Sequence, residues 1–117
     1  MTHKDLDAWK LSFDLVKEIY LITKKFPKEE IFGISNQMRR ASVSIPSNIA
    51  EGAARNSKKE FKQFLYISLG SLSELETQIL ISVELNFITK ETDLINRIIE
   101  IRKRILGLIK YLSKSDS

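Results

Sequence analysis

Acidic, histidine and cysteine side chains are the usual carriers of acid–base, nucleophilic or metal chemistry, and this sequence offers few of them. Glu74 and Glu76 look like a catalytic carboxylate pair, but two residues apart on a helix they point about 160° from each other. The single histidine, His3, cannot supply the paired Glu-x-x-His ligands of a di-iron bundle. With no cysteine, the chain has no thiolate nucleophile or thiolate metal ligand. These patterns predict no catalytic residues, no metal site and no cofactor.

Sequence signatures of nucleotide binding and of RNA cleavage are also missing. The chain has no P-loop and no Gly-rich dinucleotide fingerprint. It also lacks the Arg-x4-His pattern that small helical ribonucleases use. We therefore expect a protein that is not an enzyme.

Basic side chains are the more promising chemical groups, because they are unevenly distributed. The net charge is +4, and residues 36–62 and 93–117 are basic whereas residues 63–92 are acidic. Clustered cations can bind phosphate groups, although pairing of charges between helices explains the same distribution. The candidate nucleic-acid contacts are Arg39, Arg40, Arg55, Lys58, Lys59, Lys62, Lys103 and Lys110.

Few aromatic residues are interleaved with these basic residues, so there is no platform on which bases could stack. We therefore expect weak binding of RNA or DNA, without sequence specificity. The alternative is a protein-interaction scaffold or accessory subunit that has no nucleic-acid role and binds a still unidentified protein.

Length and composition indicate one domain, residues 1–117, that is large enough to bury a core. No apolar run approaches the roughly 20 residues that span a bilayer, which predicts no membrane partner. The start, MTHKDLDAWK, has no apolar segment typical of a secretory signal. Together with the lack of cysteine, this predicts a cytoplasmic protein.

Hydrophobic periodicity predicts an all-α fold, an antiparallel up-down four-helix bundle. Residues Trp9, Phe13, Val16 and Tyr20 recur at helical spacing and are the expected core face of the first helix. Ser57 is a good N-cap for the third helix, with Glu60 positioned to reach back to it. No segment alternates with the period of a strand. The expected helices are about 6–26, 33–55, 58–85 and 90–113.

The second helix is unusual because its sequence, RRASVSIPSNIAEG, contains Pro46. Helical periodicity runs through this segment, which favours one helix with a kink of about 20° or more where proline removes a backbone hydrogen bond. Two short helices that restart near Pro46 are the alternative.

Small and apolar residues also occupy the side of the second helix opposite its core face, and the third helix repeats the pattern. One bundle cannot bury both sides of these helices, and exposed apolar surface of this extent usually marks a protein interface. We therefore expect a homo-oligomer, although scattered exposed aliphatic residues are the alternative. The expected interface residues are Val43, Ser47, Ala50, Ala54, Ile67, Gly70 and Ile81.

Three polar residues lie close to the expected core or interface. Glu76 is near the core face of the third helix, where an unpaired carboxylate is costly, and Asn48 is positioned to donate to it. Glu51 lies near Arg40 on the flank of the second helix. These residues form either a structural polar network that sets helix register and subunit contacts, or solvated edges.

The segments PKEE, RRASVSIPSNIAEG and SKKEFKQFLYISLGSLSELETQI, in this order, resemble the small four-helix-bundle family named after proteins encoded in intervening sequences of 23S rRNA genes. That family is similar to the accessory variability protein of diversity-generating retroelements, which works with a reverse transcriptase and nucleic acid. The resemblance covers nearly the whole chain. It implies an antiparallel up-down bundle, assembly into a ring-like pentamer and no established enzymatic activity.

Overall fold

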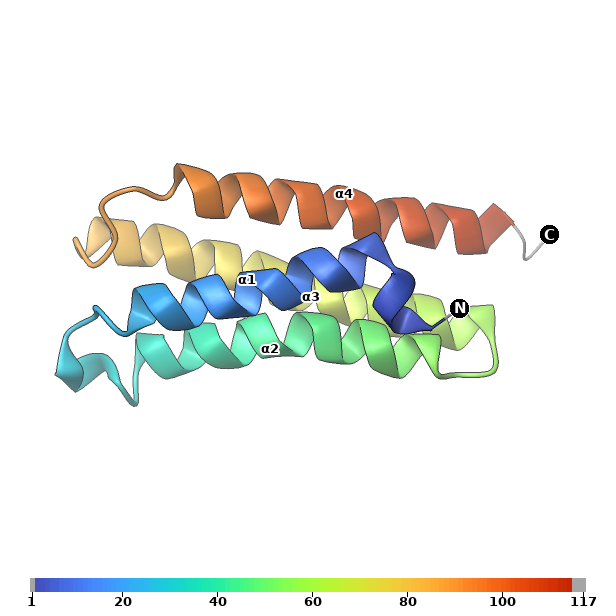
Figure 1. Cartoon of the computed structure of the whole chain (residues 1–117), viewed down its shortest axis with the longest axis horizontal. Coiled ribbons are helices and arrows are strands. Elements are labelled where there is room, and N and C mark those ends of the chain that lie inside the picture. The colour runs from blue at the N-terminus through green and yellow to red at the C-terminus, as the bar shows by residue number, and fades with distance from the viewer. Residues whose placement is uncertain (1, 115–117) are drawn as a thin grey trace.

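The computed structural model describes residues 2–114 and contains four long helices that lie side by side (Figure 1). Consecutive helices run in opposite directions, so both chain termini lie at the same end. Each long helix packs against two others, in the cyclic order α1, α2, α3, α4. Two short 3₁₀ helices, η1 and η2, precede α1 and α2. The elements are η1 His3–Asp5, α1 Asp7–Thr23, η2 Lys28–Glu30, α2 Ile34–Ala53, α3 Lys58–Glu84 and α4 Thr92–Lys114.

The all-α, four-helix prediction is therefore confirmed, and no strand occurs within residues 2–114. The predicted start of α3 coincides with the observed one, and the other predicted helix ends differ from the observed ends by one to three residues. Local backbone features explain where α3 begins and ends. The backbone N–H of Glu60 donates to the Ser57 hydroxyl over 3.1 Å, which caps α3 as expected. At its other end α3 stops at Glu84, and Asn86, two residues later, takes the left-handed backbone conformation (φ 64°) that asparagine tolerates.

The core lies between the helices and consists mainly of leucine and isoleucine. Aliphatic residues that recur at helical spacing in α2, α3 and α4, such as Ile45, Leu72 and Ile101, are buried in this core. Completely buried aliphatic side chains each stabilise the fold by about 1.5–3 kcal/mol. The largest fully buried side chains are Leu15, Ile19, Met38, Ile45, Ile49, Leu65, Leu72, Leu75, Ile79, Ile98, Ile101 and Ile105.

The prediction for the core face of α1 is wrong. The buried residues are Ala8, Leu15 and Ile19, whereas Phe13 is 55% exposed. Trp9 and Val16 are half-buried, and Tyr20 is exposed. Both sides of α1 are apolar, so its periodicity did not determine which side faces the core. The bundle buries the smaller aliphatic residues and leaves the aromatic stripe at the surface.

α2 continues without interruption through Pro46, which excludes two short helices. Pro46 has no backbone N–H and therefore cannot donate to the Ser42 carbonyl. Side chains instead bond to the carbonyls of the two residues before Pro46. The Ser68 hydroxyl of α3 donates to the Ile45 carbonyl over 3.0 Å, and the Asn48 amide donates to the Ser44 carbonyl over 2.8 Å. α2 is thus held to α3 beside its proline.

α2 and α3 form the closest helix pair in the bundle. Gly52 makes this approach possible, because a Cβ atom there would lie 2.8 Å from Phe64 Cβ and 2.9 Å from Phe61 Cδ1. The glycine of the IPSNIAEG segment is therefore required by packing.

Candidate nucleic-acid and subunit interfaces

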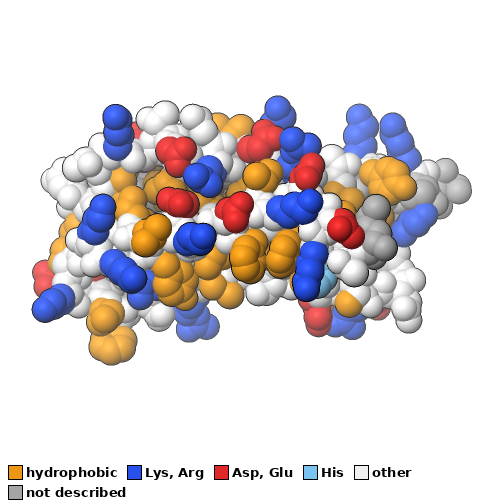
Figure 2. All heavy atoms as spheres, viewed as in Figure 1, with side chains coloured by type: hydrophobic (Ala, Val, Ile, Leu, Met, Phe, Trp, Pro, Cys, Tyr) orange, Lys and Arg blue, Asp and Glu red, His pale blue; other side chains and the backbone are white. Residues whose placement is uncertain are grey.

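One end of the bundle is rich in basic side chains. α3 begins where α4 ends, and Lys62 Nζ donates to the Ser113 hydroxyl over 3.4 Å. This contact brings Lys58, Lys59 and Lys62 to the same end as Lys110. All of these are exposed except Lys62, which is half-buried. Figure 2 shows several Lys and Arg side chains around this end.

Lys103 lies two turns before Lys110, about 10.5 Å along the helix, and is exposed. Its neighbour Arg104 binds Glu100 over 3.0 Å and Asp7 over 3.4 Å. Lys103 therefore extends the basic end along α4, whereas the charge of Arg104 is balanced by carboxylates.

Arg39 of α2 has structural contacts. Arg39 Nε donates to Thr23 Oγ1 over 2.9 Å, and its guanidinium lies 4.8 Å from the centre of the Tyr20 ring. Arg39 thus joins α2 to the end of α1, far from the basic end. Arg40 is exposed one residue further along.

Arg55 follows α2 and lies close to the basic end. It binds Glu51 over 2.9 Å and lies 5.0 Å from the centre of the Phe64 ring. Both ion-pair partners are well exposed, so phosphate could replace Glu51 at little cost.

The expected polar network has different partners from those predicted. Glu76 accepts from Arg102 Nη2 on α4 over 2.7 Å, and each side chain of this pair is about 30% exposed. Asn48 does not donate to Glu76, because its amide donates to the Ser44 carbonyl and the Ser44 hydroxyl. Glu51 binds Arg55 and not Arg40. The Ser44 hydroxyl in turn bonds to Ser71 on α3 over 2.9 Å, so Asn48 helps to fix the α2–α3 contact.

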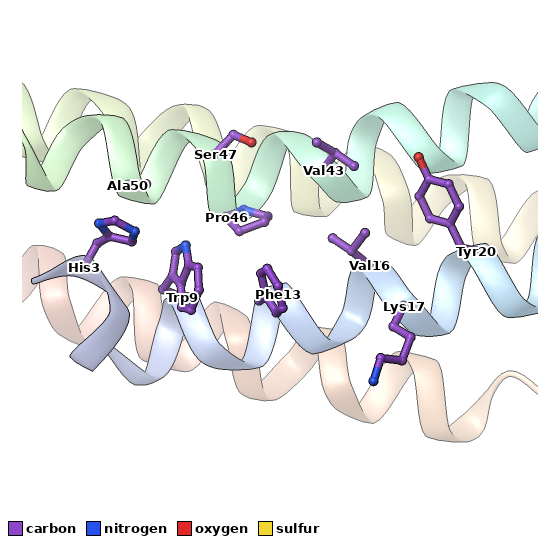
Figure 3. Close-up of a pocket in the computed structure, with 10 residues that line it drawn as sticks. All are labelled: His3, Trp9, Phe13, Val16, Lys17, Tyr20, Val43, Pro46, Ser47 and Ala50. Carbon is purple, nitrogen blue, oxygen red and sulfur yellow. The ribbon is translucent and has the colours of Figure 1, made fainter.

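A large apolar groove runs between α1 and α2 (Figure 3). Phe13 and Pro46 point toward each other across it, as do Val16 and Val43. The groove has a volume of about 690 Å³. Figure 2 shows hydrophobic side chains gathered along this line. The lining residues are His3, Trp9, Phe13, Val16, Lys17, Tyr20, Val43, Pro46, Ser47 and Ala50.

Three of the expected interface residues, Val43, Ser47 and Ala50, therefore line this groove together with the aromatic stripe of α1. The helical spacing of that stripe predicted a core position, so its place in the groove was not predicted. The regular leucine and isoleucine spacing on the other side of α1 was the signal that could have revealed the error. The remaining expected interface residues are exposed but do not line the groove; they are Ala54, Ile67, Gly70 and Ile81.

No arrangement typical of a metal site is found in the described part of the chain. Among residues 2–114, no group of three or more His, Asp or Glu side chains is placed to hold a metal ion. The hydrogen bond from Arg97 to Asp93, 3.0 Å long, raises the pKa of Arg97 above its usual value. Arg97 therefore stays charged and forms a surface ion pair.

Comparison with known proteins yields one family. The family model described as 23S rRNA-intervening sequence protein matches residues 4–107. This match spans all of α1, α2 and α3 and most of α4. No curated protein matches the chain. Within residues 2–114, none of the helices has the length and hydropathy needed to cross a membrane.

Proposed function

The chain belongs to the family of 23S rRNA-intervening sequence proteins, and from this premise we propose that it is a non-enzymatic homo-oligomer that binds RNA or DNA. Binding is weak and independent of sequence, and the protein acts in the cytoplasm. The description of the family refers to a ribosomal RNA gene and names no activity.

The basic end of the bundle is the observation that carries the nucleic-acid proposal. The contact between Lys62 and Ser113 joins the start of α3 to the end of α4. Residues 55–62 and 103–114 together hold eight basic residues and one acidic residue. Phosphate neutralisation needs clustered cations and no particular base contact, which is why the proposed binding tolerates any sequence.

The α1–α2 groove supports the proposal of a homo-oligomer. Contiguous apolar surface at the mouth of such a groove is typical of protein interfaces. In the ring of five that the family resemblance implies, each subunit contributes one basic end. Several weak phosphate contacts then act together, so that overall affinity exceeds that of one subunit.

A protein-interaction scaffold is the second candidate function, and the same groove favours it. Apart from tyrosine, the only ionisable side chains within residues 2–114 that line the groove are Lys17 and His3. A lining with so few charges suits an apolar protein segment better than a nucleic acid. In this case the basic residues serve only to keep the protein soluble.

Salt-dependent binding separates the two functions. We would measure the affinity of the protein for single-stranded and duplex RNA and DNA of unrelated sequences between roughly 50 and 200 mM salt. The test variant replaces Lys58, Lys59 and Lys62 by Gln. Each lost phosphate contact lowers the slope of log K against log salt by about 0.7–0.9 and weakens binding to all sequences alike.

A matched variant controls for the change in net charge. Lys24, Lys25 and Lys90 are exposed and follow α1 and α3, whose ends lie opposite the basic end. Replacing these three by Gln removes the same charge and is expected to leave most of the slope intact. If both triple variants lower the slope equally, the site assignment is wrong. If the unaltered protein has no affinity at the lowest salt, the scaffold function is the better explanation.

A further inference from the structure

A second apolar feature protrudes from the molecule at the junction of α1 and α2. Phe32 is 92% exposed and its neighbour Ile31 is 55% exposed. They lie between η2 and α2, and Figure 2 shows a hydrophobic projection at this end of the molecule. We call Ile31 and Phe32 the knob. A phenylalanine that is almost completely exposed makes little contact within its own bundle, so folding of the bundle does not account for it.

The α1–α2 groove has the properties of a receptor for this knob. Its volume, about 690 Å³, lies in the range that holds a drug-sized ligand, so a phenylalanine ring fits. Trp9, Phe13 and Tyr20 line one side, and aromatic rings pack well against one another. Within one chain the knob is not among the residues that line the groove.

Charged residues of both signs precede the knob, because residues 24–30 hold three lysines as well as two carboxylates. The two carboxylates are the groups that could pair with the groove. Glu29 and Glu30 directly precede the knob, whereas Lys28 is the single basic residue of η2. Lys17 and His3 line the groove, and no carboxylate does. Opposite charges at the rim of an interface favour the correct partner and orientation.

We propose that the knob of one copy inserts into the α1–α2 groove of a second copy. This inference rests on the homo-oligomer of the proposed function and specifies its contact. Phe32 would rest on Phe13 and Pro46, which face each other across the groove, and Glu29 would approach Lys17. Because the knob and the groove are different surfaces of one chain, the contact is heterologous, and repeating it generates a ring when the rotation closes.

The knob alone is too small for a stable interface, so the contact extends beyond it. One buried aromatic side chain supplies about 200 Å², whereas a stable interface covers about 800 Å² on each partner. The outer face of α2 borders the groove and presents Val43, Ser47 and Ala50, whose small side chains allow close approach. Three of the expected interface residues, Val43, Ser47 and Ala50, would thus surround the knob.

Two complementary variants test this contact. Phe32→Lys removes the knob and leaves the groove intact, and Ala50→Arg fills the groove and leaves the knob intact. Both introduced charges are positive, so the altered knob cannot pair with the altered groove. We expect each variant alone to be a monomer of about 13.5 kDa. An equimolar mixture should form a dimer of twice this mass, because one intact knob then meets one intact groove.

Leu106→Lys is the matched control, because Leu106 is an exposed apolar residue of α4 (48%) and belongs to neither feature. We expect this variant to keep the oligomeric state of the unaltered protein. Trp9, the single tryptophan, provides a second readout from inside the groove. Assembly should shift its emission to shorter wavelength in the unaltered protein, and Phe32→Lys should abolish this concentration-dependent shift. Circular dichroism checks that each variant is folded.

The possible outcomes separate this inference from the function on which it rests. An unaltered protein that is monomeric at all concentrations overturns both the homo-oligomer and the knob contact. An unaltered oligomer that persists in Phe32→Lys overturns the knob contact alone. If Phe32→Lys and Ala50→Arg are both monomers and form no dimer when mixed, Phe32 of one copy does not contact the groove at Ala50 of another. This result also overturns the knob contact.

Discussion

The Ser68 hydroxyl of α3 donates a hydrogen bond to the Ile45 carbonyl of α2 over 3.0 Å, and the bond is completely buried. It joins the two helices at the residue before Pro46. A hydroxyl that reaches a carbonyl of another helix stabilises one register of the pair. This relationship ties the distinctive proline segment of α2 to a single position on α3.

Ser68→Ala should lower the free energy of unfolding by about 1 kcal/mol, the usual net contribution of one hydrogen bond. Urea unfolding followed by circular dichroism measures the change. Ser73→Ala on the exposed side of α3 is the control, because it changes helix propensity without removing a buried bond. It should be neutral or slightly stabilising. Equal effects of the two substitutions would show that the bond to Ile45 contributes nothing.

Gly52→Ala should destabilise the bundle by about 1–3 kcal/mol, the range for overpacked cores. The new Cβ would lie 2.8 Å from Phe64 Cβ and 3.2 Å from the Phe61 carbonyl oxygen, and neither atom can move without shifting α3. Gly107→Ala makes the same change on α4, where nothing lies within 4 Å. It should instead stabilise by about 0.5–1 kcal/mol. In thermal unfolding we expect Gly52→Ala to lower the melting temperature and Gly107→Ala to raise it. A higher melting temperature for Gly52→Ala would contradict the packing argument.

Periodicity predicted the cores of α2, α3 and α4 because one face of each helix carries an aliphatic series at steps of three and four residues that coincides with the buried face. α1 has two apolar stripes, whose centres lie about 110° apart at 100° per residue. One contains Ala8, Leu15 and Ile19, and the other is the aromatic stripe that begins at Trp9. Residue size favoured the aromatic stripe, but the space between four closely packed helices accommodates the smaller side chains. Only the positions of α2 and α4 determine which stripe is buried.

Polar partners were harder to predict than core positions, because they depend on contacts between helices that are distant in sequence. Glu76 was correctly expected to be partly buried. Its partner Arg102 lies on α4, 26 residues away, and nothing in the sequence around Arg102 indicates this ion pair. Asn48 was expected to reach across to Glu76 and instead bonds within its own helix. Helical periodicity gives the side of a helix on which a residue lies, but not the residue it meets there.

Glu76→Gln should cost about 1.5 kcal/mol of stability, because it leaves the half-buried guanidinium of Arg102 without its counter-charge. The control is Glu51→Gln, which removes the exposed ion pair with Arg55 and should cost less than about 0.5 kcal/mol. Urea unfolding of Glu76→Gln, of Arg102→Gln and of the double variant Glu76→Gln/Arg102→Gln gives the coupling energy of the pair. Glu51→Gln is measured in the same way. A Glu76→Gln variant as stable as Glu51→Gln would mean that the pair behaves like a surface contact.

Pro46→Ala separates the stability of the bundle from its assembly. The alanine N–H can bond to the Ser42 carbonyl, which should add about 1 kcal/mol, while the more flexible unfolded chain removes about 0.4–1 kcal/mol. Helix content and stability should therefore change little. The proline ring faces Phe13 in the groove, and we propose that a bend at Pro46 helps to place Val43 and Ala50. We therefore expect weaker assembly, measured by light scattering as a lower mass at a given concentration.

Ser47→Ala, a change of similar size in the same groove, should leave the mass unaltered. Unchanged assembly in Pro46→Ala would show that neither the proline side chain nor a bend of α2 at Pro46 shapes the contact surface.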